Sequence, residues 1–572
     1  MTASQIIVLA TPVFLLMIGA EYALGRARGR PLYRLNDAVS SISLGILSQL
    51  SGLFTRLLSL GIYTAVYDTV APWPDLPFWS TWWGVLLALV FYDFCYYWLH
   101  RAGHEVAVFW GAHVVHHQSQ AYNLSTALRQ TSSGALLGWV FYLPMALAGV
   151  PPLIMGIVAL IDLLYQFWVH TELVGKLGWF DRVFCSPSNH RVHHAVNDRY
   201  LDRNYGGILI LWDRLFGSFR EEDEPCVYGT RANLRSWDPL WANAEVYWAL
   251  LRDSWHTRRW SDKLRLWFKP PGWRPADLAQ RWPRPAFDLQ QVEVFDPPLD
   301  KAAAWLAGLQ FLVLLAGVAV VLWFAASWPP SRTAILSAAL VACFWALGAL
   351  LQGRLSALAD LMVVSAAWAT AFSALGMATP HQVFKPLTML LALALVAAQP
   401  PAGPARNRLL LTGALAGSLA GDVFLMLPGG QWFIPGLASF LVAHLFYIAL
   451  FRAGQPWFAS RRALLATLAL GAGMYMVVLP GLTGTVLQIA VALYVVVIAL
   501  MTAQAIGRAA RLRTPAAVAV AVGACFFMLS DSLLAINRFV TPLPLSGLWV
   551  LSTYYTAQIL IVLHALHPTD PR

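Results

Sequence analysis

The feature that most constrains this chain is a series of apolar runs of bilayer length, which recur from one end of the sequence to the other. A helix needs about 20 apolar residues to cross the hydrocarbon core, and it satisfies all its backbone polar groups within one segment. Of the 572 residues, 58% are hydrophobic and 12% are charged, whereas soluble domains carry about 25% charged residues. The sequence therefore predicts an all-α, multi-pass integral membrane protein with two helical bundles.

The runs are not evenly spread, and their distribution suggests domains. The runs expected to form helices before the first long gap are residues 6–24, 38–63, 79–99, 136–150 and 153–169, the last two as a hairpin turned by Gly149-Val-Pro-Pro152. Residues 175–300 contain no spanning run, and we interpret this Arg-, Trp- and Pro-rich segment as a cap with amphipathic interfacial helices. Roughly nine spans follow between residues 302 and 566. The predicted domains are residues 1–300, a connecting helix at 301–331, and residues 332–572.

The basic residues suggest an orientation. The first run is followed by Arg26, Arg28, Arg30 and Arg34, whereas a signal peptide carries its basic residues before the apolar run. We therefore expect a retained helix whose basic end is cytoplasmic. The formal net charge of +10 is explained by the usual excess of basic residues on the cytoplasmic side of membrane proteins and by attraction to anionic lipids. No nucleic-acid partner is therefore expected.

Nine of the fourteen histidines lie within 95 residues and form a recurring pattern. They are His100, His104, His113, His116, His117, His170, His190, His193 and His194. HxxxH and HxxHH spacings put imidazoles on one helical face, within reach of each other. Neutral imidazole is a ligand for iron, zinc, copper and nickel, and one ion needs only three or four protein ligands. A single histidine is usually a core or surface residue, but this clustering predicts two metal ions on the cytoplasmic side of the membrane.

These motifs also carry a family resemblance. Their order resembles the fatty acid hydroxylase (sterol desaturase) superfamily of membrane di-iron oxygenases. The strings Tyr92-Asp-Phe-Cys-Tyr-Tyr-Trp-Leu-His-Arg-Ala-Gly-His-Glu105 and Ser186-Pro-Ser-Asn-His-Arg-Val-His-His194 resemble its alkylglycerol monooxygenase family, over about residues 1–300. The resemblance implies that the histidines hold a di-iron centre and that Glu105 is a catalytic acidic residue. In related hydroxylases a helical histidine pair before the last motif also binds metal; here His170 occupies one of these positions and Gln166 the other.

The implied reaction is hydroxylation, with O2, of the carbon next to an ether oxygen in an alkylglycerol. The resulting hemiacetal collapses to a fatty aldehyde and a glycerol moiety. The resemblance implies tetrahydropterin as the reductant, and because no dinucleotide-binding motif is present, the alternative is an external electron donor. Iron is favoured over zinc by the reaction, not by the ligands.

The second half carries ionisable residues inside its apolar runs. A charge at the centre of a bilayer costs about 2.5 to 3.5 kcal/mol, so such residues face the bundle interior, pair with each other or lie near the surface. The strings Phe384-Lys-Pro-Leu387, Gly421-Asp-Val-Phe424, Phe440-Leu-Val-Ala-His-Leu-Phe-Tyr447 and Gly523-Ala-Cys-Phe-Phe-Met-Leu-Ser-Asp531 resemble the YhhN-like lysoplasmalogenase family, over about residues 332–567.

That resemblance implies hydrolysis of the vinyl ether bond of lysoplasmalogens. Protonation at carbon followed by attack of water needs an acid and a base, for which Asp422 and Asp531 are the candidates. Lys385 is a candidate to lower a carboxylate pKa or to bind phosphate. His444 and Tyr447, three residues apart on one helical face, are candidates to complete the substrate pocket.

Several alternatives stay open at the level of the sequence. The first half is also compatible with a hydroxylase or desaturase of fatty acyl or sterol lipids, or with a structural zinc site. The polar residues of the second half are also compatible with a non-catalytic bundle, either an anchor or a transporter-like module. The leading interpretation is a bifunctional membrane enzyme that degrades ether lipids, because both implied reactions release a fatty aldehyde.

Overall fold

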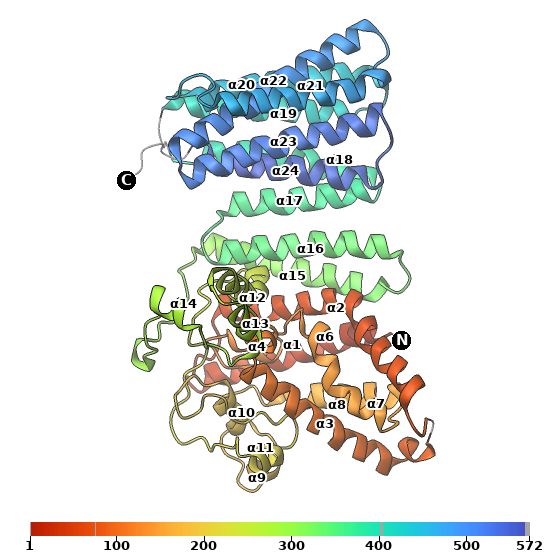
Figure 1. The fold of residues 1–572 in the computed structure, drawn as a ribbon, viewed down its shortest axis with the longest axis vertical. Coiled ribbons are helices and arrows are strands. Elements are labelled where there is room, and N and C mark those ends of the chain that lie inside the picture. Colours follow the sequence, from red (N-terminus) through yellow and green to blue (C-terminus); the bar gives the residue numbers. More distant parts are fainter. Residues whose placement is uncertain (1, 75, 401–403, 567–572) are drawn as a thin grey trace. The chain divides into compact units, whose positions relative to one another are not determined.

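A computed structural model describes residues 2–74, 76–400 and 404–566. Within these ranges the regular structure is helical, and two isolated bridges are the only strand-like pairings (Figure 1). The described residues include 13 helices that are long and apolar enough to cross a bilayer. The predicted fold class, an all-α multi-pass membrane protein, is confirmed. The chain divides into two compact units, Met1–Trp328 with Leu351–Gly353, and Pro329–Leu350 with Arg354–Arg572.

Four helices of the first unit are candidate membrane spans. They are α1 (Ala3–Ala27), α2 (Leu35–Val70), α3 (Trp82–Glu105) and α15 (Lys301–Phe324). Side-chain caps explain where some of them begin, because the Thr81 hydroxyl accepts from the Gly84 amide at the start of α3 and Asp300 caps α15. Helix α15 packs on α1 and α2.

The predicted hairpin is present, but its first arm is not one helix. The first apolar run forms α6 (Gly134–Leu137), the 3₁₀ segment η2 (Gly138–Tyr142) and α7 (Leu143–Leu147), and the second forms α8 (Pro152–Trp168). Pro144 lies in the first turn of α7, where a missing amide hydrogen is tolerated, so the helix restarts there. Both arms are shorter than a bilayer needs. Helix α8 packs on α3, and its last turn leads directly to His170.

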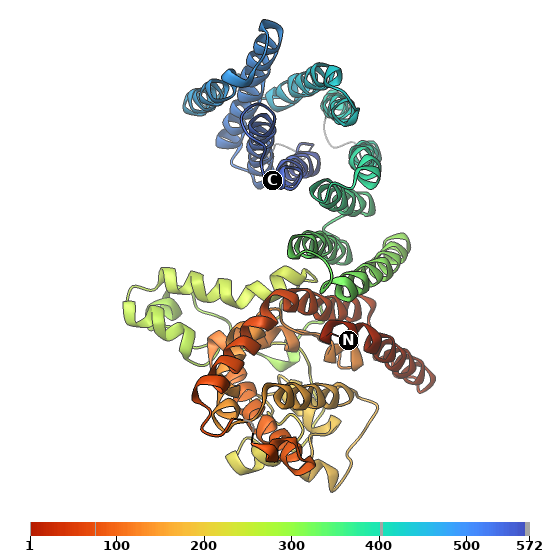
Figure 2. The same ribbon diagram turned by 90° about the vertical axis from the view of Figure 1, so that its right-hand side faces the viewer.

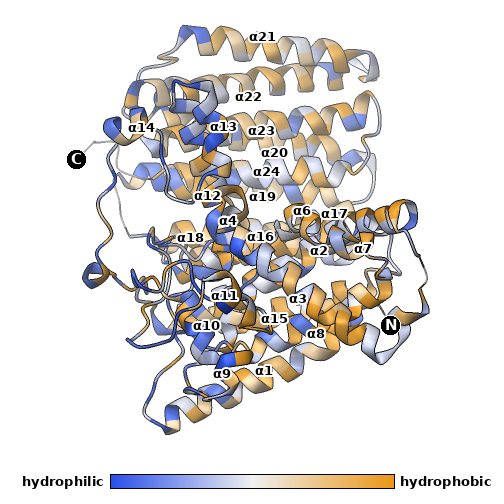
Figure 3. Ribbon diagram, turned by 60° about the horizontal axis from the view of Figure 1, so that its bottom comes forward, coloured by the Kyte–Doolittle hydropathy of each residue, from blue (hydrophilic) through white to orange (hydrophobic). Residues whose placement is uncertain are grey.

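The cap consists of short helices joined by loops. Its helices are α9 (Phe180–Val183), α10 (Pro187–His194), α11 (Leu211–Phe216), α12 (Pro239–His256), α13 (Trp260–Phe268), α14 (Ala276–Arg281) and the 3₁₀ segment η3 (Leu289–Gln291). Figure 3 shows hydrophilic residues gathered in this region and hydrophobic residues along the long helices. Helix α4 (Ala107–His117) joins the span α3 to this layer and packs on α12.

The second unit is a bundle of long helices that run side by side (Figures 1 and 2). They are α16 (Pro330–Leu351), α17 (Ala357–Ala374), α18 (Ala378–Ala398), α19 (Ala405–Met426), α20 (Phe433–Arg452), α21 (Arg461–Val478), α22 (Thr485–Leu512), α23 (Pro515–Phe539) and α24 (Ser546–His564). With α15, the described residues after 300 contain ten candidate spans, one more than the roughly nine expected. Neighbours in sequence pack as pairs, and α17 also packs on α24.

Helices α19 and α20 approach each other closely, which sets the position of the polar residues between them. A β-carbon on Gly421 would lie 2.5 Å from the ring of Phe440, and one on Gly417 would lie 3.0 Å from the carbonyl oxygen of Ser439. Glycine at these two positions therefore allows the helix backbones to come together. Asp422 follows directly on α19, and His444 lies one turn beyond Phe440 on α20.

Candidate metal centre and candidate ether-hydrolase site

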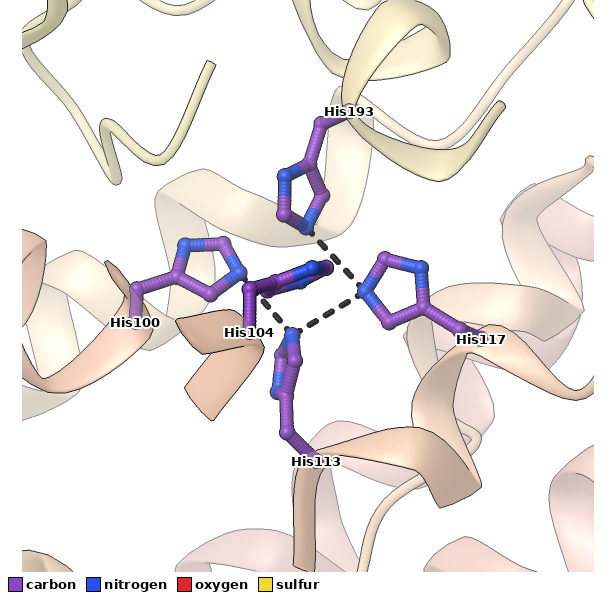
Figure 4. Close-up of side chains that lie close together, drawn as sticks. All are labelled: His100, His104, His113, His117 and His193. Carbon is purple, nitrogen blue, oxygen red and sulfur yellow. Dashed lines mark hydrogen bonds between the residues drawn. The ribbon is translucent and has the colours of Figure 1, made fainter. Parts of the chain in front are cut away.

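The nine histidines form two groups. The first group is His100, His104, His113, His117 and His193, and the second is His116, His170, His190 and His194. Within each group, one ring nitrogen from every residue lies within 4.8 Å of the others. Figure 4 shows the rings of the first group converging from separate helices on one point.

Helix geometry explains how each motif is divided. His113 and His117, four residues apart on α4, share a face and join the first group, while His116 is turned toward the second. On α10, His190 and His194 join the second group and His193 joins the first. Both HxxHH motifs therefore contribute to both groups, and α3 and the turn after α8 complete them.

Packing holds α4 in this register. Val114 and Val115, on the side of α4 away from the histidines, are buried with Leu44 of α2 and Ala242 of α12. A β-carbon on Gly111 would lie 2.7 Å from the ring of Tyr247 on α12, so this helix pair is in close contact.

Backbone carbonyls orient several of the rings. In the first group, His100 Nδ1 lies 2.7 Å from the carbonyl oxygen of Tyr205, and His193 Nδ1 lies 3.1 Å from the carbonyl oxygen of Arg203. In the second group, His116 Nδ1 lies 2.9 Å from the Arg129 carbonyl oxygen, and His170 Nδ1 lies 2.8 Å from that of Gln166. A carbonyl oxygen only accepts, so in a neutral ring Nδ1 carries the hydrogen and Nε2 is an unprotonated lone pair.

The inner nitrogens fit metal ligands. His116 Nε2 and His170 Nε2 lie 3.1 Å apart. Both are acceptors in the neutral rings, so they cannot hydrogen-bond to each other, and a cation between them would satisfy both lone pairs. The other contacts between Nε2 atoms span 3.0 to 3.2 Å. An ion about 2.1 Å from each nitrogen would hold adjacent ligands roughly 3.0 to 3.4 Å apart. The donor set therefore fits two metal ions.

Burial keeps the rings outside the membrane spans neutral. Removal from water lowers the pKa of His113, His117, His190, His193 and His194 well below the usual value, and neighbouring imidazoles lower it further. For His116, burial lowers the pKa to about 4. A neutral imidazole is the form that binds a metal ion.

Glu105 belongs to neither group. Its side chain is 42% exposed and accepts from Arg101 Nε at 3.0 Å and from the Tyr205 hydroxyl at 3.4 Å. The Tyr205 ring in turn contacts the rings of His100, His104 and His193. Gln166, where the family resemblance implies a second histidine, contributes its backbone carbonyl to His170, while its side chain bonds Asp162 and Tyr96.

Sequence reasoning missed the loop that holds the first group. The loop Asp202–Tyr205 contributes two of the carbonyl oxygens described above, and the Asp202 carboxylate lies 3.4 Å from His104 Nδ1. Asp202 and Asn204 both have left-handed backbone conformations, with φ of 56° and 55°, which Asp and Asn tolerate better than most residues. The sequence carries no spacing signal for this arrangement, because the loop contacts helices about 100 residues earlier.

In the second unit, Asp422 lies in a buried ion pair. Its carboxylate is 3.3 Å from Lys385 Nζ of α18 and accepts from the Tyr554 hydroxyl of α24 at 2.7 Å. Both charged side chains are at most 10% exposed. Pairing of this kind removes the cost of an isolated charge among apolar helices.

Asp531 of α23 forms a separate cluster. Its carboxylate accepts from the Tyr494 hydroxyl, and His444 Nε2 lies 3.9 Å away. His444 Nδ1 bonds the Phe440 carbonyl, so Nε2 faces the carboxylate as a lone pair when the ring is neutral.

Tyr447 is not part of that cluster. Its hydroxyl donates to Gln558 at 2.6 Å, and the Gln558 amide donates to Ser418. The structure thus separates His444 and Tyr447, which share a helix face, between two polar clusters.

A cavity of about 70 Å³ lies between α20, α21, α22 and α23. Its lining is mostly apolar and includes the polar side chains of Asp531, Tyr494 and Ser532. Phe440 also lines it and contacts the ring of Tyr554, which binds Asp422. Asp531, one of the two carboxylates predicted from the sequence, therefore lines a cavity.

Comparisons with known proteins match both halves. The family model described as fatty acid hydroxylase matches residues 85–218, and that of the YhhN family matches residues 380–565. Alkylglycerol monooxygenase of Homo sapiens is 40% identical over 271 residues, which cover 46% of this chain and 59% of the human protein. That of Xenopus tropicalis is 37% identical, covering 54% of this chain and 68% of the relative. The chain thus covers less than two thirds of the length of the human protein and slightly more than two thirds of the length of the frog protein.

A different relative matches over a shorter stretch. Lysoplasmalogenase TMEM86A of Homo sapiens is 36% identical over 160 residues, which cover 27% of this chain and 64% of that protein. No solved structure matches. The chain therefore belongs to the alkylglycerol monooxygenase family within the fatty acid hydroxylases, and it also contains a YhhN family domain.

Proposed function

We propose that this chain is a bifunctional membrane enzyme that degrades ether lipids, with one active site in each half. The proposed domains are residues 1–300, a connecting helix at 301–331, and residues 332–572, of which 401–403 and 567–572 lie outside the described residues. The observation that carries the proposal is the pair of histidine groups, in which acceptor nitrogens face each other across the space that a metal ion would fill.

The first half would cleave alkylglycerol ethers. One oxygen atom of O2 enters the C–H bond next to the ether oxygen, and the other leaves as water with two protons and two electrons from a reductant. The hemiacetal then breaks its C–O bond to give a fatty aldehyde and a glycerol moiety. Two iron ions, one in each histidine group, would supply the activation of O2. Tetrahydropterin is the proposed reductant, with an external electron donor as the alternative.

The side chains of the first half would hold and orient this centre. The nine histidines are the proposed ligands, and backbone carbonyls behind His100, His116, His170 and His193 would fix which nitrogen of these four rings points inward. Glu105 remains the proposed catalytic carboxylate, and its hydrogen bond with Tyr205 links it to the rings of the first group.

We further propose that the metal centre lies on the cytoplasmic side. Arg30, in the basic segment after α1, lies 3.8 Å from the carboxylate of Glu172, two residues after His170. Glu21 of α1 bonds the Thr171 hydroxyl and the Leu124 amide. The basic end of α1 and the second histidine group thus share one side of the first unit, and an excess of basic residues favours the cytoplasm.

The second half would hydrolyse the vinyl ether of a lysoplasmalogen. An acid adds a proton to the β-carbon of the C=C bond, water adds to the resulting oxocarbenium carbon, and a base takes the proton of that water. The hemiacetal then breaks to a fatty aldehyde and the glycerol hydroxyl. Asp531 is the proposed acid because it lines the cavity, and Asp422 is the proposed base. Lys385, His444 and Tyr447 are the proposed substrate-site residues, with Lys385 paired to the Asp422 carboxylate.

The test measures fatty aldehyde release by the full chain in lipid nanodiscs. We expect release from a 1-O-alkylglycerol only with O2, iron and a reductant, and release from lysoplasmalogen in the absence of O2. His190→Ala should abolish only the first activity and Asp531→Asn only the second, so each variant is the folding control for the other. Bound zinc with no turnover under any reductant would refute the oxygenase, and lysoplasmalogen turnover unchanged in Asp531→Asn would refute the assigned acid.

A further inference from the structure

The cavity beside Asp531 continues toward one end of its helices. The same residues Phe433, Arg538 and Phe539 line both this cavity and a second, wider one of about 490 Å³. The wider cavity is bounded by the starts of α20 and α22 and by the loop at 483–484. Because these are helix ends, the wider cavity lies where a spanning bundle meets the headgroup region of the membrane.

Arg538 lies at the junction of the two cavities. It is exposed, and its guanidinium carbon lies 4.0 Å from the ring centroid of Phe433 and 5.9 Å from that of Phe539. Within the described part of the chain, Arg538 forms no ion pair with a carboxylate. A guanidinium held between aromatic rings keeps its donors available for a planar or tetrahedral anion.

Arg538 and Asp531 face the same cavity from one helix. They are seven residues apart on α23, which amounts to two turns and a rise of about 10.5 Å. Both line the inner cavity together with Met528 and Ala535. The inner cavity is apolar apart from a few groups, so it offers a cation at its mouth, an acid further in and hydrocarbon walls between them.

This spacing matches one class of ether lipid. In a lysoplasmalogen, seven bonds separate the phosphorus atom from the vinyl carbon that accepts the proton. In an extended zigzag chain each bond of about 1.5 Å advances about 1.25 Å along the axis, so the two atoms lie roughly 9 Å apart. A phosphate bound at Arg538 would therefore bring the vinyl ether to the level of Asp531. A phosphate-free alkenylglycerol fits the apolar walls equally well but leaves Arg538 without an anion.

We infer that the cavity between α20, α21, α22 and α23 is a lysophospholipid site, in which Arg538 binds the phosphate of the headgroup and sets the register of the vinyl ether against Asp531. This rests on the proposed hydrolase function of the second half. It adds a specificity-determining residue that selects phosphate-bearing lipids over neutral ones.

A purely structural role for Arg538 makes a different prediction. A cation in the last turn of a helix interacts favourably with the helix dipole, and its stacking on Phe433 stabilises the helix end. Loss of that role would weaken the bundle without distinguishing one lipid from another. Arg452 provides a matched control, because it is also exposed in the last turn of its helix and stacks on an aromatic ring, Trp457, at 4.6 Å.

The experiment compares the full chain with its Arg538→Gln and Arg452→Gln variants in nanodiscs without O2. The first readout is KM for lysoplasmalogen and for 1-O-alkenylglycerol, which lacks phosphate. For Arg538→Gln we expect KM for lysoplasmalogen to rise on the order of tenfold or more, because a charge-assisted bidentate contact is lost. KM for alkenylglycerol should change less than about twofold, and Arg452→Gln should change neither.

A second readout does not need turnover. A photoreactive 1-O-alkyl lysophospholipid with a diazirine in its chain should label peptides of α22 and α23, and Arg538→Gln should reduce that labelling at least about fivefold. Its phosphate-free counterpart should label all three proteins equally. Inorganic phosphate should not compete at millimolar concentration, which separates a lipid site from a simple anion site.

The outcomes are distinguishable. Labelling that depends on Arg538, without aldehyde release by the unchanged protein, would refute the hydrolase proposal and keep the lysophospholipid site. Aldehyde release with equal effects of Arg538→Gln on both lipids, or with no effect, would keep the hydrolase and overturn the role of Arg538. Competition by inorganic phosphate alone would also overturn the role of Arg538, since the site would then bind a free anion and not a lipid.

Discussion

The nitrogen that each histidine turns away from the metal centre determines what the other nitrogen can do. In His116 and His170, Nδ1 faces a backbone carbonyl, so both inner nitrogens are acceptors although they lie 3.1 Å apart. Two buried acceptors in contact are unfavourable unless a cation lies between them. The fixed carbonyls thus prepare the rings for a metal ion before one binds.

A first prediction concerns the independence of the two groups. His116→Ala removes a ligand of the second group, so we expect bound metal to fall from two ions to about one per chain, because the first group keeps all its ligands. Alkylglycerol cleavage should fall more than about 100-fold. Metal content is measured by mass spectrometry of the purified protein. His256→Ala, in an exposed residue at the end of α12, is the control and should retain both ions; loss of both ions in His116→Ala would contradict two separate sites.

A second prediction concerns pH. Burial lowers the pKa of His116 to about 4 and that of His113, His190 and His194 well below the ordinary value near 6.5. The unfolded chain therefore binds more protons than the metal-free folded chain between those values, and stability is lost as pH falls below about 6.5.

Bound metal should be released in the same pH window, because protons compete for the lone pairs. The measurement is iron retention and melting temperature of the purified protein between pH 8 and 5. Both should be nearly constant from pH 8 to 7 and decline below about pH 6.5. Iron retention unchanged down to pH 5 would argue against imidazole ligands.

At the scale of elements, the loop Asp202–Tyr205 orients rings of the first group that are carried by two separate helices, α3 and α10. It contacts His100, His104 and His193 through two carbonyls and one carboxylate. The spacing of the histidines predicted that they would cluster, because helical periodicity is a local property. It did not predict that His116 would separate from His113 and His117, or that this loop would orient the rings, because both depend on contacts between segments distant in sequence.

A third prediction tests this loop. Asp202→Ala removes the carboxylate beside His104 Nδ1, and we expect metal affinity to fall about 10- to 100-fold. Asp202→Asn keeps an acceptor oxygen and should lose less. Affinity is measured by competition with a chromophoric chelator. Asp198→Ala is a matched control, because its carboxylate pairs with Arg231 and not with a histidine; an equal loss in both alanine variants would indicate a general effect of charge.

Helix α13 has an exposed apolar face. Asp262 and Leu266 face the protein and are buried, whereas Trp260, Leu264 and Phe268 are 81%, 69% and 68% exposed on the opposite side. Exposed apolar stripes of this kind on a basic helix are typical of the membrane interface.

A fourth prediction follows from that face. A spin label at Leu264→Cys, in a Cys525→Ser background that removes the exposed cysteine, should be more accessible to O2 than to a water-soluble nickel complex. A label at Arg265→Cys, on the neighbouring polar side, should show the reverse. If both labels are equally accessible to the nickel complex, α13 faces water.

At the scale of the whole molecule, each proposed reaction has its polar residues within one unit. The histidines lie in the first unit, and Asp422, Asp531 and their partners lie in the second. The apolar runs predicted the architecture well, because the length that a bilayer requires is a strong constraint. Two features could not be predicted from the sequence. The broken helix at 134–147 depends on where a helix restarts, and the cavity beside Asp531 depends on how four helices pack.

A fifth prediction follows from this division. A metal ion that binds only the folded first unit stabilises that unit by about 1.4 kcal/mol for each tenfold excess of free ion over its dissociation constant. Chelation should therefore increase hydrogen exchange in α4, α10 and the loop at 202–205, whose folded state the ions support. The helices α17 to α24 should be unchanged, because their core contains no ligand of either group. Exchange is followed by mass spectrometry in nanodiscs, and His190→Ala should reproduce the effect of chelation within the first unit. A parallel increase in α19 and α23 would contradict two separately stabilised units, and it would predict that loss of metal also reduces vinyl ether hydrolysis.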